Sequence, residues 1–288
     1  MNASGRIAQL ILNLAGSVCL ICFFAGPTEA QVSAVYVDPL NLIHASDQYL
    51  SKGIEMIRFG DPEGAIQYLK KNRTISKNTF ESEFLIGYAA KQAGNLDMAI
   101  DYFSKATRYE SLSLPAFFER ANCYLIRKNF GAAVSDYNRA IIIDSTFAPA
   151  YNNRAFARIR HYGDKETSIY LLKLARKDLE KVIALNQGIP ATARFEYFFN
   201  LGLLDLYQSE YMSAKLSFDT AIAANPGIAK IYYYRGAANF LARYYQRAAL
   251  DFKKASELGF LSAETPEFLK VIDLINAHEA LTGEHVGR

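Results

Sequence analysis

Small residues recur along this chain at a fixed interval, and that spacing restricts how it can fold. One series is Gly53, Gly87, Ala121, Ala155, Gly202 and Gly236. Successive members are 34 residues apart up to Ala155, and the last two repeat the interval. A second series is Ala65, Ala99, Ala133, Ala175, Ala214 and Ala248. Because helices approach closely only where their side chains are small, the two series predict recurring helix pairs that cross at Gly or Ala.

Large apolar residues follow the second series four positions later. They are Leu69, Phe103, Tyr137, Leu179, Phe218 and Phe252. These residues and the two small series resemble the tetratricopeptide repeat family, whose unit is a 34-residue helix–turn–helix. The resemblance covers about residues 46–262 in six copies, at 46–79, 80–113, 114–147, 148–189, 195–228 and 229–262.

The resemblance implies an all-α fold, a right-handed superhelical solenoid of six helix pairs. One pair cannot bury its apolar face alone, so stacked pairs share a continuous core and leave a concave side. Residues 31–45 are interpreted as a linker. In residues 263–288, Thr265-Pro266-Glu267 is a helix start, and we expect a capping helix followed by a short tail.

Repeat four departs from the regular spacing. Ala155 and Ala175 are 20 residues apart, where a regular copy has 12. The extra residues fall around His161–Tyr170, and Gly163-Asp164 is interpreted as a turn. The insertion is either a surface loop, a lengthened second helix or a specificity loop at the edge of the binding groove.

The first thirty residues differ in composition from the repeats. Arg6 precedes an uncharged run at residues 7–27, and Thr28-Glu29-Ala30 supplies a cleavage-like end. This outline is typical of a secretory signal peptide cut after Ala30. The alternative is a retained membrane anchor through residues 7–27, since about 20 residues can span a bilayer. Either way we expect an exported, periplasmic or envelope-associated bacterial protein.

No catalytic or metal-binding motif stands out in the sequence. The four histidines are scattered, and the part after residue 30 has no Gly-rich phosphate loop and no Cys-x-x-Cys. Cys123 is interpreted as a small buried thiol. A net charge of +3 without a basic stripe argues against nucleic acid as a partner. We therefore expect no enzyme activity, no cofactor and no metal, and the sequence does not indicate an oligomeric state.

The family resemblance implies that certain first-helix positions line the concave groove. Transferred to this chain, they predict a partner-binding strip of Phe84, Tyr88, Phe118, Asn122, Asn152, Phe156, Phe199 and Tyr233. The aromatic rings could hold apolar side chains, and the asparagines could bond to the backbone of an extended peptide. The alternative is that some of these rings only pack against neighbouring helices.

Arg120, Arg154 and Arg235 recur directly before the small residue of the first helix, and Asp136 and Asp251 recur in second helices. We interpret them as structural pairs between helices. The basic clamp with which some relatives hold a C-terminal carboxylate is missing. The leading hypothesis is a non-catalytic scaffold that binds a protein or peptide in the groove. The alternative is a structural assembly factor of a bacterial secretion or envelope complex that acts through surface contacts.

Overall fold

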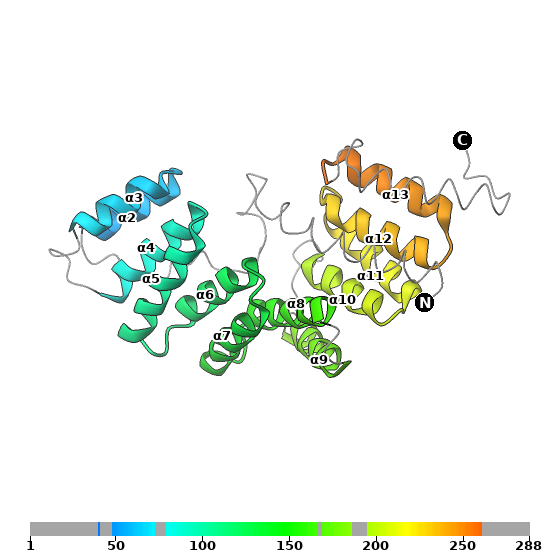
Figure 1. Ribbon diagram of the computed structural model, residues 1–288, viewed down its shortest axis with the longest axis horizontal. Helices are drawn as coiled ribbons and strands as arrows, with labels where there is room; N and C mark the ends of the chain where they lie inside the picture. The colour runs from blue at the N-terminus through cyan, green and yellow to red at the C-terminus, as the bar shows by residue number, and fades with distance from the viewer. Residues whose placement is uncertain (1–39, 41–47, 73–78, 166–168, 186–194, 261–288) are drawn as a thin grey trace. The chain divides into compact units, whose positions relative to one another are not determined.

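The computed structural model describes residues 40, 48–72, 79–165, 169–185 and 195–260, without the side chains of residues 72 and 162–165. These described ranges contain twelve helices and no strand (Figure 1). The chain divides into two compact units. The N-terminal unit is residues 35–161, and the C-terminal unit contains residues 162–288.

In the N-terminal unit, helices follow one another in antiparallel pairs separated by short turns. They are α2 (Gln48–Arg58), α3 (Pro62–Asn72), α4 (Phe80–Gln92), α5 (Leu96–Tyr109), α6 (Leu114–Ile126), α7 (Phe130–Ile143) and α8 (Ala148–Lys165), which includes the unit boundary. The C-terminal unit continues with α9 (Ile169–Leu185), α10 (Phe195–Tyr207), α11 (Tyr211–Ala224), α12 (Ala229–Leu241) and α13 (Tyr245–Glu257). The all-α prediction is confirmed.

The glycines of the first helices lie where the large residues of the second helices approach. A Cβ atom added at Gly202 would lie 2.6 Å from the Phe218 ring, and one at Gly53 would lie 2.5 Å from Leu69. Gly87 and Gly236 face Phe103 and Phe252 in the same way, at 3.0 and 2.9 Å. The predicted phase of the repeats is therefore confirmed, because each glycine contacts the large residue of its own repeat.

Side-chain caps and left-handed residues end one helix and begin the next within a few positions. Between α6 and α7, Lys128 has a φ of 59°, and the Asn129 side chain accepts a hydrogen bond from the Ala132 N–H at 3.3 Å. Gly94 and Asn95 do the same before α5, with a φ of 76° and a 3.1 Å bond from the Met98 N–H. An Asn at the cap satisfies an N–H that has no partner inside the helix.

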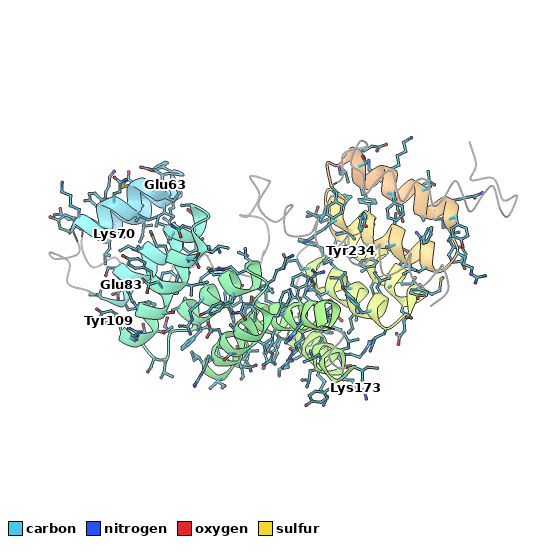
Figure 2. All side chains as sticks on the ribbon, viewed as in Figure 1. Glu63, Lys70, Glu83, Tyr109, Lys173 and Tyr234 are labelled. Carbon is cyan, nitrogen blue, oxygen red and sulfur yellow. The ribbon has the colours of Figure 1, made fainter. Side chains whose placement is uncertain are left out.

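The core of the C-terminal unit is rich in aromatic residues. Tyr234, labelled in Figure 2, is 2% exposed, and its ring centroid lies 5.4 Å from that of Phe199 and 6.2 Å from that of Phe218. Three helices, α10, α11 and α12, supply these rings. The alanines of the second series lie between the helices with no exposed surface.

Repeat four differs from what its sequence predicts. The turn expected at Gly163-Asp164 is wrong, because α8 continues through both residues to Lys165 and reaches 18 residues. Helix α9 has 17 residues, whereas the second helices α5, α7 and α11 have 14 each. The added residues therefore lengthen both helices of this repeat. Intrahelical hydrogen bonds outweigh the weak preference of one Gly and one Asp for a turn.

Several predicted segments lie outside the described residues. They are the signal peptide or anchor at 1–30, most of the linker at 31–45 and the capping helix after residue 262. Among the helices that the structure does describe, none combines the length and the apolar character needed to cross a bilayer.

Candidate functional site

A chain of polar side chains joins the first helices of the N-terminal unit. The Lys91 Nζ of α4 donates to the Glu119 Oε2 of α6 at 3.0 Å. The Glu119 side chain is 1% exposed and that of Lys91 is 17% exposed, so the ion pair is nearly enclosed. A buried charge is costly unless it is paired and hydrogen-bonded, and each of these two charges compensates the other.

Asn122 extends this chain of polar groups to two further helices. Its Oδ1 accepts a 2.7 Å bond from the Tyr137 hydroxyl of α7 and a 3.1 Å bond from the Asn153 Nδ2 of α8. Its Nδ2 donates to Glu119 at 3.4 Å. The amide orientation is therefore set by the network, because only the oxygen can accept two donors.

Two groups of this network, Lys91 and Tyr137, keep their protonation state near neutral pH. Burial by itself lowers the pKa of the Lys91 ammonium, but the Glu119 carboxylate together with Tyr88 and Cys123 more than offsets this, and the net pKa is raised above its usual range. Burial also raises the pKa of the Tyr137 hydroxyl well above its ordinary value. Lys91 therefore stays charged and Tyr137 stays protonated, so both side chains act as hydrogen-bond donors in fixed places.

We define the first-helix surface as the side chains of Tyr88, Lys91, Asn122, Asn153 and Phe156. All five are partly exposed. The Lys91 ammonium also lies 5.5 Å from the centroid of the Tyr88 ring. An ammonium has three N–H donors, and Glu119 takes one of them. The surface therefore combines aromatic rings, amides and a cation within reach of solvent.

Four residues of the predicted binding strip lie in the protein core. Phe84, Phe118, Phe199 and Tyr233 are 0%, 4%, 3% and 2% exposed. Each ring contacts the large second-helix residue of its own repeat. The distances between ring centroids are 5.4 Å for Phe84–Phe103, 5.7 Å for Phe118–Tyr137, 6.0 Å for Phe199–Phe218 and 5.4 Å for Tyr233–Phe252. These four rings therefore stabilise helix pairs and do not form exposed anchors, as the alternative interpretation proposed.

The other members of the predicted strip are more accessible. Tyr88, Asn122 and Phe156 are half-buried, and Asn152 is 8% exposed. The Asn152 Nδ2 lies 3.5 Å from the Asn153 Oδ1. Tyr88, Asn122, Asn152 and Phe156 belong to α4, α6 and α8 of the N-terminal unit, and hydrogen bonds connect Asn122 with the α8 asparagines. That these residues bind a partner remains a prediction.

Lys91, Glu119 and Asn153 were not part of the predicted strip. Lys91 and Glu119 are 28 residues apart, and nothing in the repeat pattern marks them as partners. One signal was present: Glu119 directly follows Phe118 and lies two positions before Ala121, the small residue at the helix crossing. A buried acid in a helix-packing position requires a cation nearby.

The structural arginine pairs are confirmed. Arg120 binds Asp136 with two bonds of 2.7 and 2.8 Å, and Arg235 binds Asp251 with bonds of 2.5 to 3.1 Å. Arg154 differs, because its Nη1 donates to the Asn138 Oδ1 at 2.6 Å. Arg120 also reaches the Ser104 hydroxyl of the preceding second helix at 2.9 Å, so it connects two repeats.

Metal ligands do not gather anywhere in the described residues. No group of three or more His, Cys, Asp or Glu side chains there could hold an ion. Cys123 is buried, with no exposed surface.

Residues 84–149 and 199–259 match the family model described as tetratricopeptide repeat. These two stretches of the chain are tetratricopeptide repeats. Among curated proteins the chain is 34% identical over 92 residues to RNA polymerase II-associated protein 3 of Mus musculus. The match covers 32% of this chain and 13% of that protein, so the chain spans about an eighth of its relative.

Several solved structures resemble this fold, one of them a tetratricopeptide repeat protein by its description. A repeat protein from Parabacteroides merdae has a TM-score of 0.57 at 19% identity, over 80% of this chain and 98% of that one. The Cut9–Hcn1 hetero-tetramer of the APC/C has a TM-score of 0.63 at 17% identity, over 82% of this chain and 43% of that one. MamA from Desulfovibrio magneticus has a TM-score of 0.52 at 20% identity, over 66% of this chain and 97% of that one. At these identities the likeness concerns the fold alone.

Proposed function

We propose that this protein is a non-catalytic scaffold that binds an extended peptide segment of a partner protein at the first-helix surface. The observation that supports the proposal best is the Lys91–Glu119–Asn122 network. It places a charged donor and fixed amides on the first helices of the N-terminal unit. An extended peptide offers carbonyl groups at regular intervals and side chains for ring faces, which suits such a surface.

The rigidity of the network favours binding over catalysis. Asn122 is held by Tyr137, Asn153 and Glu119, so its position changes little when a peptide arrives. Preorganised groups lose less conformational entropy on binding. Lys91 can donate to a carbonyl or carboxylate of the peptide while it keeps its bond to Glu119, because an ammonium has two further N–H groups.

Photo-crosslinking in the native host tests the proposal. A photoreactive phenylalanine analogue replaces Tyr88 or Phe156 in turn, and Tyr109 serves as the control. Tyr109 ends the second helix α5 and is 51% exposed (Figure 2). We expect the same partner to be captured from positions 88 and 156 and not from 109. Capture from position 109 alone would contradict the proposal and would favour an assembly role through the second helices.

We also propose that the protein is exported, with residues 1–30 as a cleaved signal peptide. Arg6, the uncharged run at 7–27 and the small residues up to Ala30 support this. Export requires a mature N-terminus at Gln31, which mass spectrometry of the host-expressed protein detects. An intact Met1 in the membrane fraction would instead indicate a retained anchor, and an intact Met1 in the cytoplasm would contradict export.

A further inference from the structure

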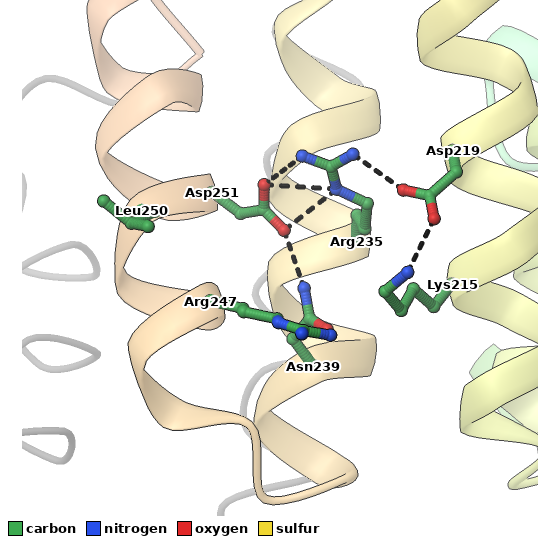
Figure 3. A pocket seen from close by; sticks show the side chains of 7 residues that line it. All are labelled: Lys215, Asp219, Arg235, Asn239, Arg247, Leu250 and Asp251. Carbon is green, nitrogen blue, oxygen red and sulfur yellow. Dashed lines mark hydrogen bonds and ion pairs between the residues drawn. The ribbon is translucent and has the colours of Figure 1, made fainter. Parts of the chain in front are cut away.

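A polar cleft opens between α11 and α13 in the C-terminal unit, with α12 between them (Figure 3). Its volume is about 400 Å³. The lining residues are Lys215, Asp219, Arg235, Asn239, Arg247, Leu250 and Asp251. None of them belongs to the first-helix surface, so the cleft is independent of the proposed function.

Arg235 fixes the floor of the cleft. Its Nη1 donates to the Asp219 Oδ1 of α11 at 2.7 Å, and its Nε and Nη2 bind Asp251 of α13 at 2.5 to 3.1 Å. The Lys215 ammonium donates to the other carboxylate oxygen, Asp219 Oδ2, at 2.7 Å. Both carboxylates are therefore already neutralised by cations of the cleft (Figure 3).

Asn239 leaves one acceptor in the cleft unused. Its Nδ2 donates to the Asp251 Oδ2 at 2.8 Å, which sets the orientation of the amide because a carboxylate accepts only from the nitrogen. The side chain is 2% exposed, and its Oδ1 has no hydrogen-bond partner among the described residues. A buried carbonyl oxygen without a donor is costly, so the site favours a ligand that brings an N–H.

Arg247 leaves a cation in the cleft without a counter-ion. Its guanidinium lies 5.3 Å from the centroid of the Tyr244 ring and forms no ion pair or hydrogen bond within the described part of the chain. Leu250, one turn further along α13, is 67% exposed. The cleft therefore presents a free cation, an unused acceptor and an apolar side chain together.

We propose that this cleft binds an acidic peptide segment of a partner protein. A side-chain carboxylate of the peptide pairs with Arg247, a backbone N–H donates to the Asn239 Oδ1, and a neighbouring apolar side chain covers Leu250. A simple anion satisfies Arg247 but not the Asn239 oxygen, which repels it. A peptide supplies both groups in one molecule, and guanidinium is suited to two-bond recognition of carboxylates.

Titration with short blocked peptides tests the proposal on the full chain labelled with ¹⁵N. The probe is acetyl-Ala-Glu-Leu-Glu-Ala-amide, and its neutral counterpart carries Gln in place of Glu. We expect the acidic peptide to shift the Asn239 side-chain amide and Arg247 Nε signals in a saturable way. The neutral peptide should bind up to about fivefold more weakly, as the loss of an exposed ion pair predicts.

Two charge-removing variants on α13 separate the cleft from general electrostatic attraction. Arg247→Gln should raise the dissociation constant of the acidic peptide about fivefold, and Lys253→Gln should change that constant by less than about twofold. Lys253 is exposed on the same helix but does not line the cleft. Equal effects of the two variants would overturn the proposal. Equal binding of the acidic and neutral peptides, or no shift at Asn239, would also overturn it.

Discussion

At the scale of single residues, Asn122 organises the polar network of the first helices. Its Oδ1 accepts from both Tyr137 and Asn153. Replacing it by alanine leaves the buried Tyr137 hydroxyl without this acceptor, so Asn122→Ala should lower the free energy of unfolding by about 1–3 kcal/mol. Urea denaturation measures the change, and Ser135→Ala on the exposed face of α7 is the control. Equal midpoints for the two variants would show that the network does not stabilise the fold.

Glu196 gives the C-terminal unit a pH-dependent stability. Burial raises its pKa to about 7 from an ordinary value of 4.5, although the Lys230 ammonium lowers it in part. The folded state therefore binds more protons than the unfolded state between pH 4.5 and 7. The stabilisation by the protonated acid is present below pH 4.5 and is lost as pH rises through 7.

The predicted fall of the free energy of unfolding with rising pH can be measured by thermal unfolding between pH 5 and 8. We expect the wild-type protein to lose roughly 1–2 kcal/mol across this window through Glu196. Glu196→Gln cannot ionise, so it should lack this part of the slope and should be more stable than wild type at pH 8. A slope that Glu196→Gln leaves unchanged would mean that another group titrates.

At the scale of the helix pair, the close approach at glycine decides stability. A Cβ atom at Gly202 would lie 2.6 Å from the Phe218 ring, whereas one at Gly131 would contact nothing within 4 Å. Gly202→Ala should therefore cost about 1–3 kcal/mol through overpacking. Gly131→Ala, in the exposed first turn of α7, should be neutral or should stabilise the protein by up to about 1 kcal/mol. Denaturant midpoints that move equally for the two variants would contradict this packing.

The helix pairs could be predicted from the sequence because their cause is local and repeated. A small residue at each crossing and a large residue opposite it, as at Gly87 and Phe103, leave few other packings. The length of α8 could not be predicted, because Gly163-Asp164 has a turn preference that the surrounding helix overrides. Burial of Phe84 and Phe118 depends on how deeply each ring inserts between two helices. That depth cannot be predicted from the spacing of residues along the chain.

At the scale of the whole molecule, repeats of one design carry two chemically different surfaces. The first-helix surface of the N-terminal unit has a buried ion pair with partly exposed rings and amides. The cleft of the C-terminal unit lies against second helices and holds the Arg247 guanidinium, which has no counter-ion among the described residues. Some of the polar pairs could not be found from the sequence, since Lys91 and Glu119 are 28 positions apart and Asp219 and Arg235 are 16 apart. Such pairs become neighbours only when repeats stack.

The central claim is that the first-helix surface binds the partner, and calorimetric titration of the captured partner tests it most directly. Tyr88→Ala with Phe156→Ala removes two partly exposed rings, and each contact of this kind is worth about 1 kcal/mol, so the dissociation constant should rise roughly 30-fold. Tyr109→Ala is the control on a second helix, and circular dichroism should show unchanged helix content in all variants. A double variant that binds the partner as tightly as wild type would contradict the account.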